Sequence, residues 1–212
     1  GFIPRKAARL APDREGLIDV PNDRRITYGE LEQRVVKLAN GFLTAGLNKG
    51  DRIAVLSKNC IEYLEVYFAC ARVGLIAQPL NWRLGLEELT RIIENGEPSI
   101  LVCSDEYLDM ANDLAEVVSR ICVFGTNSDG SYEALVATGS SSEPPTSSSV
   151  GSDDPVLILY TGGTTGESKG ALHTHTSLYM GMLNQTVAER IVPTDVYMLT
   201  GQMFHIPVGL AM

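Results

Sequence analysis

The sequence is poor in the residues on which several common kinds of site depend. It contains four cysteines, three histidines and one tryptophan in 212 residues. The cysteines show neither CxxC spacing nor the mixed Cys and His spacing of a zinc site, so the simplest interpretation is a set of reduced thiols. They stand at Cys60, Cys70, Cys103 and Cys122.

Long apolar runs are also absent. No run approaches the roughly 20 residues that a helix needs to cross a bilayer. The Arg- and Lys-bearing start lacks the apolar stretch of a secretion signal. The sequence therefore predicts no transmembrane segment and a cytoplasmic location. Because the chain begins at Gly1 and stops at Met212 in apolar sequence, we expect it to be a fragment of a longer protein.

Basic residues are in deficit. Asp and Glu number 26 against 17 Lys and Arg, which gives a net charge of -9. A nucleic-acid-binding protein usually carries a basic stripe or patch, and none is visible, so we expect no nucleic-acid partner. An acidic protein can still bind a nucleotide, because a few local donors are enough to hold the phosphates.

What the sequence does contain is a regular alternation of predicted elements. Thr27-Tyr28-Gly29-Glu30 has the form of a capping box, and apolar residues at helical spacing follow it until Gly46. Extended segments are predicted at 52–57, 75–80, 99–103, 121–124, 156–160, 171–174 and 196–199. Further helices are predicted at 59–73, 86–94, 105–119 and 176–190. Such alternation predicts an α/β fold with a mainly parallel sheet layered with helices, and a hydrophobic share of 44% is enough for its core.

The composition changes between residues 138 and 152 to serine, glycine and proline. Such a segment buries little apolar area, so we interpret it as an exposed connector. It would divide the chain into a first α/β subdomain at 1–137 and the start of a second at 153–212. The alternative is a long surface loop inside a single domain.

The run T-G-G-T-T-G-E-S-K-G, from Thr161 to Gly170, follows a predicted buried strand. Glycines let backbone N–H groups approach phosphate oxygens, threonine hydroxyls add donors, and Lys169 supplies a positive charge. The Walker pattern fails because Glu167 and Ser168 separate the last glycine from the lysine. The dinucleotide pattern fails because Thr161 stands where a glycine is required. A tight connector without a ligand is the remaining alternative.

This run closely resembles the phosphate-loop signature of the AMP-forming adenylating enzymes, which include acyl- and aryl-CoA synthetases, luciferases and nonribosomal peptide adenylation domains. Gly162 and Ser168 depart from the commonest pattern, which has serine and proline there. Supporting resemblances lie at 26–31, 50–55, 79–84 and 203–205, the last being Met203-Phe204-His205. The resemblance implies the N-terminal portion of the large domain of the adenylate-forming fold, with the C-terminal domain absent.

The resemblance also implies a reaction and a set of site residues. The parent enzyme would use ATP with Mg²⁺ to activate a small-molecule carboxylic acid and then transfer it to CoA, as an acid–CoA ligase does. His205 would be the catalytic residue, beside the acyl carboxylate. The nucleotide-binding residues would be Thr161, Gly162, Gly163, Thr164, Thr165, Gly166 and Lys169. No metal ligand is implied within residues 1–212, because the family's motif for adenine and magnesium would lie downstream, and the fragment alone is expected not to turn over.

Other interpretations stay open at this point. An amino-acid adenylation domain or a luciferase-like enzyme would carry a similar loop, and a nucleotide-binding module without catalysis is a further alternative. Neither the acid nor the oligomeric state can be inferred, although a homodimer is consistent with the sequence. His173 and His175 are not expected to form a metal pair. We expect Trp82 and Arg83 to be structural, and Tyr63, Tyr67 and Phe68 to lie in the core.

Overall fold

The computed structural model describes residues 3–161 and 168–205. Its sheet is formed by strands β3 to β8, and a separate antiparallel hairpin is formed by β1 and β2. The strands are β1 Glu15–Asp19, β2 Arg24–Thr27, β3 Arg52–Leu56, β4 Ile76–Pro79, β5 Ile100–Ser104, β6 Ile121–Phe124, β7 Pro155–Thr161 and β8 Lys169–Thr174. The α-helices are α1 Ile3–Leu10, α2 Tyr28–Thr44, α3 Ile61–Val73, α4 Leu86–Gly96, α5 Leu108–Asp113, α6 Ser131–Thr138 and α7 His175–Glu189.

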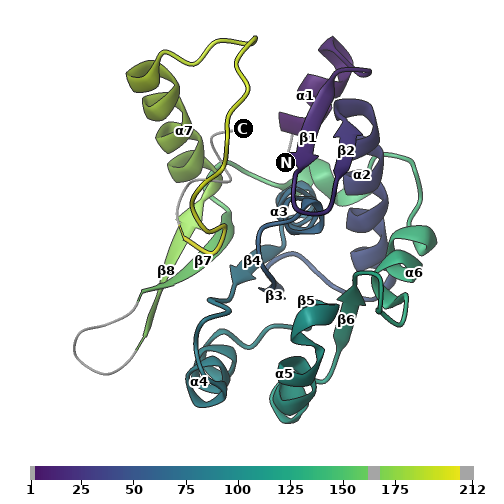
Figure 1. Cartoon of the computed structure of the whole chain (residues 1–212), viewed down its shortest axis with the longest axis vertical. Helices are drawn as coiled ribbons and strands as arrows, with labels where there is room; N and C mark the ends of the chain where they lie inside the picture. The colour runs from purple at the N-terminus through teal and green to yellow at the C-terminus, as the bar shows by residue number, and fades with distance from the viewer. Residues whose placement is uncertain (1–2, 162–167, 206–212) are drawn as a thin grey trace.

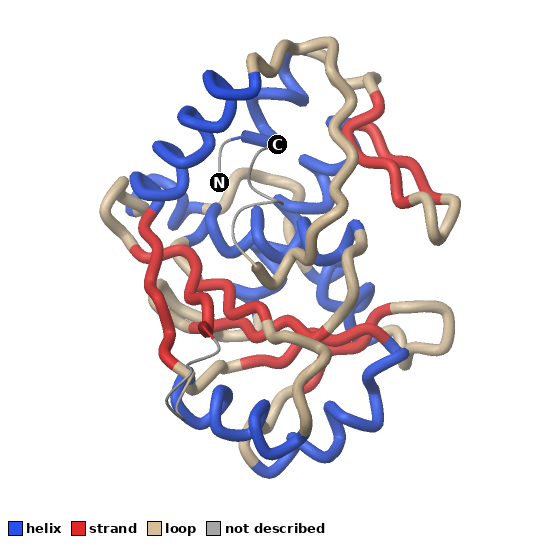
Figure 2. The backbone as a smooth tube through the Cα atoms, turned by 60° about the vertical axis from the view of Figure 1, so that its left-hand side comes forward, coloured by secondary structure: helices blue, strands red, loops and turns tan. Residues whose placement is uncertain are grey.

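The large sheet has six strands in the order β6-β5-β3-β4-β7-β8. All neighbouring pairs are parallel except β7 with β8, which is antiparallel. Helices cover both faces, as Figure 2 shows with helices above and below the red sheet. The expected α/β class with a mainly parallel sheet is therefore confirmed.

Each face of the sheet has its own apolar core. On β3 the side chains of Ile53 and Val55 join the cluster beneath α2 and α3, whereas Ala54 and Leu56 join the cluster beneath α4 and α5. This alternation follows from the two-residue period of a strand. A strand that is buried on both faces reads as a continuous apolar run, which is why β3 was visible in the sequence.

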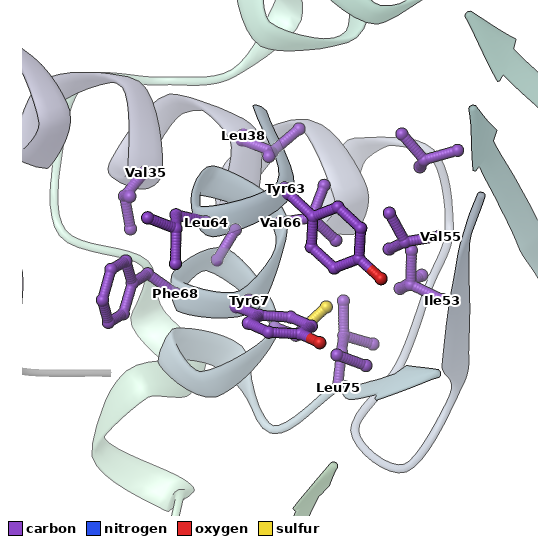
Figure 3. Packing of buried hydrophobic residues seen from close by; sticks show 14 of the residues in the cluster. Val35, Leu38, Ile53, Val55, Tyr63, Leu64, Val66, Tyr67, Phe68 and Leu75 are labelled. Carbon is purple, nitrogen blue, oxygen red and sulfur yellow. The ribbon is translucent and has the colours of Figure 1, made fainter. Parts of the chain in front are cut away.

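The larger cluster contains the predicted aromatic core residues. Tyr63 and Tyr67 on α3 meet edge to face, with ring centroids 5.2 Å apart. Phe68 lies on the same helix and is 7% exposed. Figure 3 shows these rings among Val35, Leu38, Ile53 and other aliphatic side chains. The prediction that they belong to the core is confirmed.

Helix α2 begins and ends where its local sequence requires. The Thr27 hydroxyl accepts the backbone N–H of Glu30 at 3.1 Å, and the Glu30 carboxylate accepts the backbone N–H of Thr27 at 2.7 Å. Two donors of the first turn are thereby satisfied. The chain then turns at Gly46, whose φ of +89° lies in the left-handed region. Local chemistry alone places both ends of this helix.

Two predicted elements differ from the structure. The helix expected at 105–119 is a short α5 flanked by 3₁₀ turns at 105–107 and 114–116. Ala111 in α5 and Leu114 in the following 3₁₀ turn both join the apolar cluster on this face of the sheet. The strand expected at 196–199 is irregular. Val196 and Met198 are 84% and 78% exposed, and an apolar segment becomes a strand only where it finds a pairing partner.

The Ser- and Pro-rich segment at 138–152 is held by polar contacts. The Asn40 side-chain amide donates to the carbonyls of Ser140 and Ser142, both at 2.8 Å. The buried Arg72 guanidinium pairs with Glu143 at 2.9 Å. The β4–β7 pairing joins the chain before and after this segment in one sheet. The division into two subdomains stays a prediction.

The C-terminal helix α7 stands apart from the other helices, beyond β7 and β8 (Figure 1). None of its residues is buried. In the described ranges 3–161 and 168–205, no helix combines the length and apolarity needed to cross a membrane.

Candidate nucleotide and acid site

The β7–β8 hairpin brings together the two described ends of the glycine-rich loop. Thr161 and Lys169 are direct cross-strand partners, and the Thr161 hydroxyl donates to the Lys169 carbonyl at 3.4 Å. Both residues are exposed. Of the other predicted phosphate-binding residues, Gly162, Gly163, Thr164, Thr165 and Gly166 lie outside the described residues. The hairpin therefore closes the base of the loop.

The loop leaves the sheet at the carboxyl edge of its parallel strands. β3, β4 and β7 run in the same direction, with Val55 opposite Pro79 and Ala77 opposite Leu157. The connection from β3 passes through α3 on one face, and the connection from β4 passes through α4 on the other. In open α/β sheets, ligands bind in the crevice that such diverging connections leave at the carboxyl ends of the strands. Thr161 stands at this edge.

The segment Gly201–His205 returns to the same edge of the sheet. Asn59, three residues after the end of β3, donates from Nδ2 to the Gly201 carbonyl at 2.7 Å and accepts the Met203 N–H on Oδ1 at 2.9 Å. The Tyr67 hydroxyl donates to the Met203 carbonyl at 2.8 Å. Residues more than 130 positions apart are thus joined by three hydrogen bonds.

Trp82, which follows β4, contacts the same segment. Its indole N–H donates to the Gln202 side-chain oxygen at 3.1 Å. The Arg83 guanidinium lies 4.7 Å from the centre of the Trp82 ring, and the Lys58 ammonium lies 5.6 Å from it. Lys58 also forms an ion pair with Glu106. The Trp82 indole therefore has two cations near its ring and one hydrogen bond from its N–H group.

His205 is exposed at the end of this segment. Its backbone N–H donates to the Gln202 carbonyl at 3.0 Å, and its ring lies 4.7 Å from the ring of the buried Phe204. In the part of the chain that the structure describes, no hydrogen bond or ring contact joins His205 to Thr161 or Lys169. The structure therefore places these residues at one edge of the sheet without direct contact.

Lys169 brings a positive charge to the described base of the loop. Among the described residues, no carboxylate forms an ion pair with the Lys169 ammonium, so its charge is not neutralised there.

Burial lowers the pKa of His175, at the start of α7, to about 4. The Nε2 atoms of His173 and His175 are buried without a hydrogen-bond partner. Within 3–161 and 168–205, no group of three or more His, Cys, Asp or Glu side chains is arranged to hold a metal ion.

Sequence reasoning missed Asn59 as a functional candidate. The signal available for it was a polar residue three positions after a buried strand, at the edge of the sheet that Thr161 also reaches. Tyr67 was assigned to the core, which is correct for its ring, but its hydroxyl has a separate role in holding Met203. Contacts over such sequence distances are not visible in local patterns.

A mainly parallel sheet layered with helices, with Thr161 and Lys169 paired where β7 reaches its carboxyl edge, defines a protein of the α/β class. The chain matches the AMP-binding enzyme family over residues 4–210, and it belongs to this family.

Curated relatives are similar over nearly the whole chain. A feruloyl-CoA synthase from Amycolatopsis sp. is 34% identical over 205 residues, which cover 97% of this chain and 39% of the relative. A crotonobetaine/carnitine–CoA ligase from Salmonella agona (strain SL483) is 31% identical over 214 residues, covering 97% of this chain and 40% of the relative. The chain spans about two fifths of the length of these relatives.

Solved structures share the fold. ATP-bound MatB from Rhodopseudomonas palustris is 32% identical, with a TM-score of 0.76 over 95% of this chain and 41% of that one. The N-terminal domain of FACL13 from Mycobacterium tuberculosis has a TM-score of 0.84 at 24% identity, covering 99% of this chain and 52% of that one. The predicted relation to adenylate-forming CoA ligases is therefore confirmed.

Proposed function

We propose that this chain carries the phosphate-binding part of an ATP-dependent acid–CoA ligase. In this reaction a carboxylate attacks the α-phosphate of ATP, which gives an acyl-adenylate and pyrophosphate. The CoA thiol then displaces AMP and forms the thioester. The observation that carries the proposal is the Thr161–Lys169 pair, which closes the glycine-rich loop at the carboxyl edge where the His205 segment also docks.

The residues of the loop suit a triphosphate. We assign the β- and γ-phosphates to the hydroxyls of Thr161, Thr164 and Thr165, to the backbone N–H groups of Gly162, Gly163 and Gly166, and to the Lys169 ammonium. Preorganised donors of this kind stabilise the charge that develops during phosphoryl displacement. Mg²⁺ bound to ATP would neutralise further charge, and we assign it no ligand from this chain.

His205 is the proposed catalytic residue for the acid. Its exposed ring at the end of the docked segment can donate to a carboxylate as that group approaches ATP. The buried Phe204 packs against the ring and limits its orientation. We therefore assign to His205 the orientation of the carboxylate, and not the binding of phosphate.

The names of the relatives favour CoA over a carrier protein as the acceptor. Both curated relatives are named as CoA synthase or ligase, and a related structure was solved with ATP bound. The four cysteines are free thiols, which fits a reducing compartment, and we propose the cytoplasm. We propose a small-molecule carboxylic acid, ATP and CoA as the partners.

The proposal is tested with Lys169→Ala in the complete natural protein. Loss of one preorganised donor to a phosphoryl group is expected to lower carboxylate-dependent ATP–pyrophosphate exchange by roughly 100-fold or more. A panel of aromatic and aliphatic acids identifies the substrate, and a thioester assay with CoA then tests the second step.

Lys6→Ala is the matched control, because Lys6 is an exposed lysine on α1. It should leave the exchange rate unchanged. An unchanged rate in Lys169→Ala would remove the assignment of the loop. Exchange without thioester formation would instead point to another acceptor.

A further inference from the structure

The segment Gly201–His205 has no strand or helix of its own to hold it. The Asn59 amide binds it as a neighbouring strand would, with one acceptor and one donor directed at the backbone of Met203 and Gly201. These partners also define the amide orientation, because the reverse orientation would place an NH₂ group against the Met203 N–H.

Tyr67 completes the attachment. Its hydroxyl donates to the Met203 carbonyl, so Asn59, just before α3, and Tyr67, in the middle of α3, satisfy both backbone polar groups of Met203. Tyr67 and Met203 are each 6% exposed. Buried backbone groups that lose their partners destabilise the conformation that buries them. Without Asn59 and Tyr67, the observed path of this segment would leave two such groups unpaired.

We propose that Asn59 and Tyr67 are positioning residues, which together hold the backbone at Met203 and thereby set where His205 stands relative to the Thr161–Lys169 pair. The proposal rests on the proposed function for the role of His205. Neither residue is expected to touch substrate. Their effect is geometric, because a displacement of about 1 Å at a reacting group can lower a rate by roughly 100-fold.

The chain contains its own reporter for this attachment. Trp82 is the sole tryptophan, and its indole N–H binds Gln202 between the two residues held by Asn59. Release of the segment should therefore expose the indole to solvent. Acrylamide quenching of Trp82 fluorescence in this 212-residue chain measures that exposure without any requirement for activity.

A matched control lies on the same helix. Tyr63 and Tyr67 are neighbouring buried tyrosines (Figure 3), but of these two hydroxyls it is that of Tyr67 that binds the segment, at the Met203 carbonyl. Tyr67→Phe removes one bond to the segment, whereas Tyr63→Phe removes none. Asn59→Ala removes two bonds. Circular dichroism and the thermal midpoint establish that each variant is folded.

Quenching is expected to rise in Asn59→Ala by roughly twofold or more, to rise less in Tyr67→Phe, and to stay unchanged in Tyr63→Phe. In the complete natural protein, Asn59→Ala should raise the KM for the acid or lower the exchange kcat by roughly tenfold, while the KM for ATP changes little. If the KM for the acid and the KM for ATP rise by the same factor, the variant is damaged as a whole, and the positioning role is overturned.

Unchanged quenching in both Asn59→Ala and Tyr67→Phe would overturn the attachment itself. Increased quenching with unchanged exchange kinetics would show that the segment is held but that its position is without consequence, which also overturns the proposal. If the unmodified complete protein shows no exchange with any acid, the proposed function fails, and the quenching result still decides whether Asn59 and Tyr67 hold the segment.

Discussion

The buried ion pair between α2 and α3 gives a prediction that depends only on the fold. The Glu65 carboxylate is fully buried and accepts two bonds from the Arg34 guanidinium, at 2.5 and 3.1 Å. The Tyr132 hydroxyl donates to the same carboxylate at 2.8 Å. Arg34→Met keeps much of the side-chain volume and removes the positive charge. The variant leaves Glu65 buried beside a single hydroxyl donor.

The loss of stability should be large. Removal of one partner from a buried ion pair typically lowers the free energy of unfolding by about 3–5 kcal/mol, because the remaining charge is neither hydrated nor paired. The total free energy of unfolding of a protein domain is about 5–15 kcal/mol. For a chain of this size, the loss corresponds to a fall in Tm of about 6–20 °C. Arg34 also pairs with Glu133, but that carboxylate is 58% exposed and should add little.

The loss should also depend on pH. Burial raises the pKa of Glu65 above its ordinary value, more than the bonds from Arg34 lower it. The folded state therefore holds this proton more tightly than the unfolded chain, so the contribution of Glu65 to stability is greatest below its unfolded pKa and declines as pH rises through its folded pKa. Without Arg34 the folded pKa moves further upward. The deficit of Arg34→Met should thus be smaller at about pH 5 than at about pH 7.

Thermal and urea unfolding at both pH values measure this deficit. Arg91→Met is the matched control, because Arg91 forms an exposed ion pair with Glu87 one helical turn away, which is worth about 0.3–0.5 kcal/mol. If Arg34→Met lowers the free energy of unfolding no more than Arg91→Met does, the buried ion pair does not contribute the stability that we expect from it. A deficit that grows on acidification would contradict the reasoning about Glu65.

Two further predictions concern local features. Thr27→Ala removes the capping hydroxyl of α2 and should lower the free energy of unfolding by about 1 kcal/mol, while Thr27→Ser should retain most of it; equal urea midpoints for Ala and Ser would contradict the capping role. Burial raises the pKa of every cysteine thiol, so no thiol should react quickly with a disulfide reagent near pH 8 until the protein is unfolded. Rapid labelling of the native chain would refute the second prediction. The four thiols are Cys60, Cys70, Cys103 and Cys122.

Elements with local signals were predictable from the sequence. The capping box at Thr27, the apolar spacing of α2 and the left-handed Gly74 after α3 act within a few residues, so their effect can be read without knowledge of the fold. Strand β3 was visible because burial on both faces makes it apolar throughout. The parallel sheet followed from the alternation of such segments.

Elements that depend on partners were not predictable in the same way. The hairpin of β1 and β2 pairs charged and apolar residues that show no strict alternation, and α6 lacks a strong helical stripe. The apolar segment at 196–199 was predicted as a strand but is irregular. A strand requires hydrogen bonds from another segment, and no local pattern states whether one is available.

The sequence by itself determined the α/β class, the site of the glycine-rich loop and the family, because each is expressed in contiguous residues. The tertiary structure decided that Thr161 faces Lys169 across a hairpin, and that Asn59 and Tyr67 hold the segment leading to His205. Those contacts join residues that are far apart in the chain. They arise only when the sheet places the ends of its parallel strands at one edge, which is a property of the assembled fold and not of any local sequence.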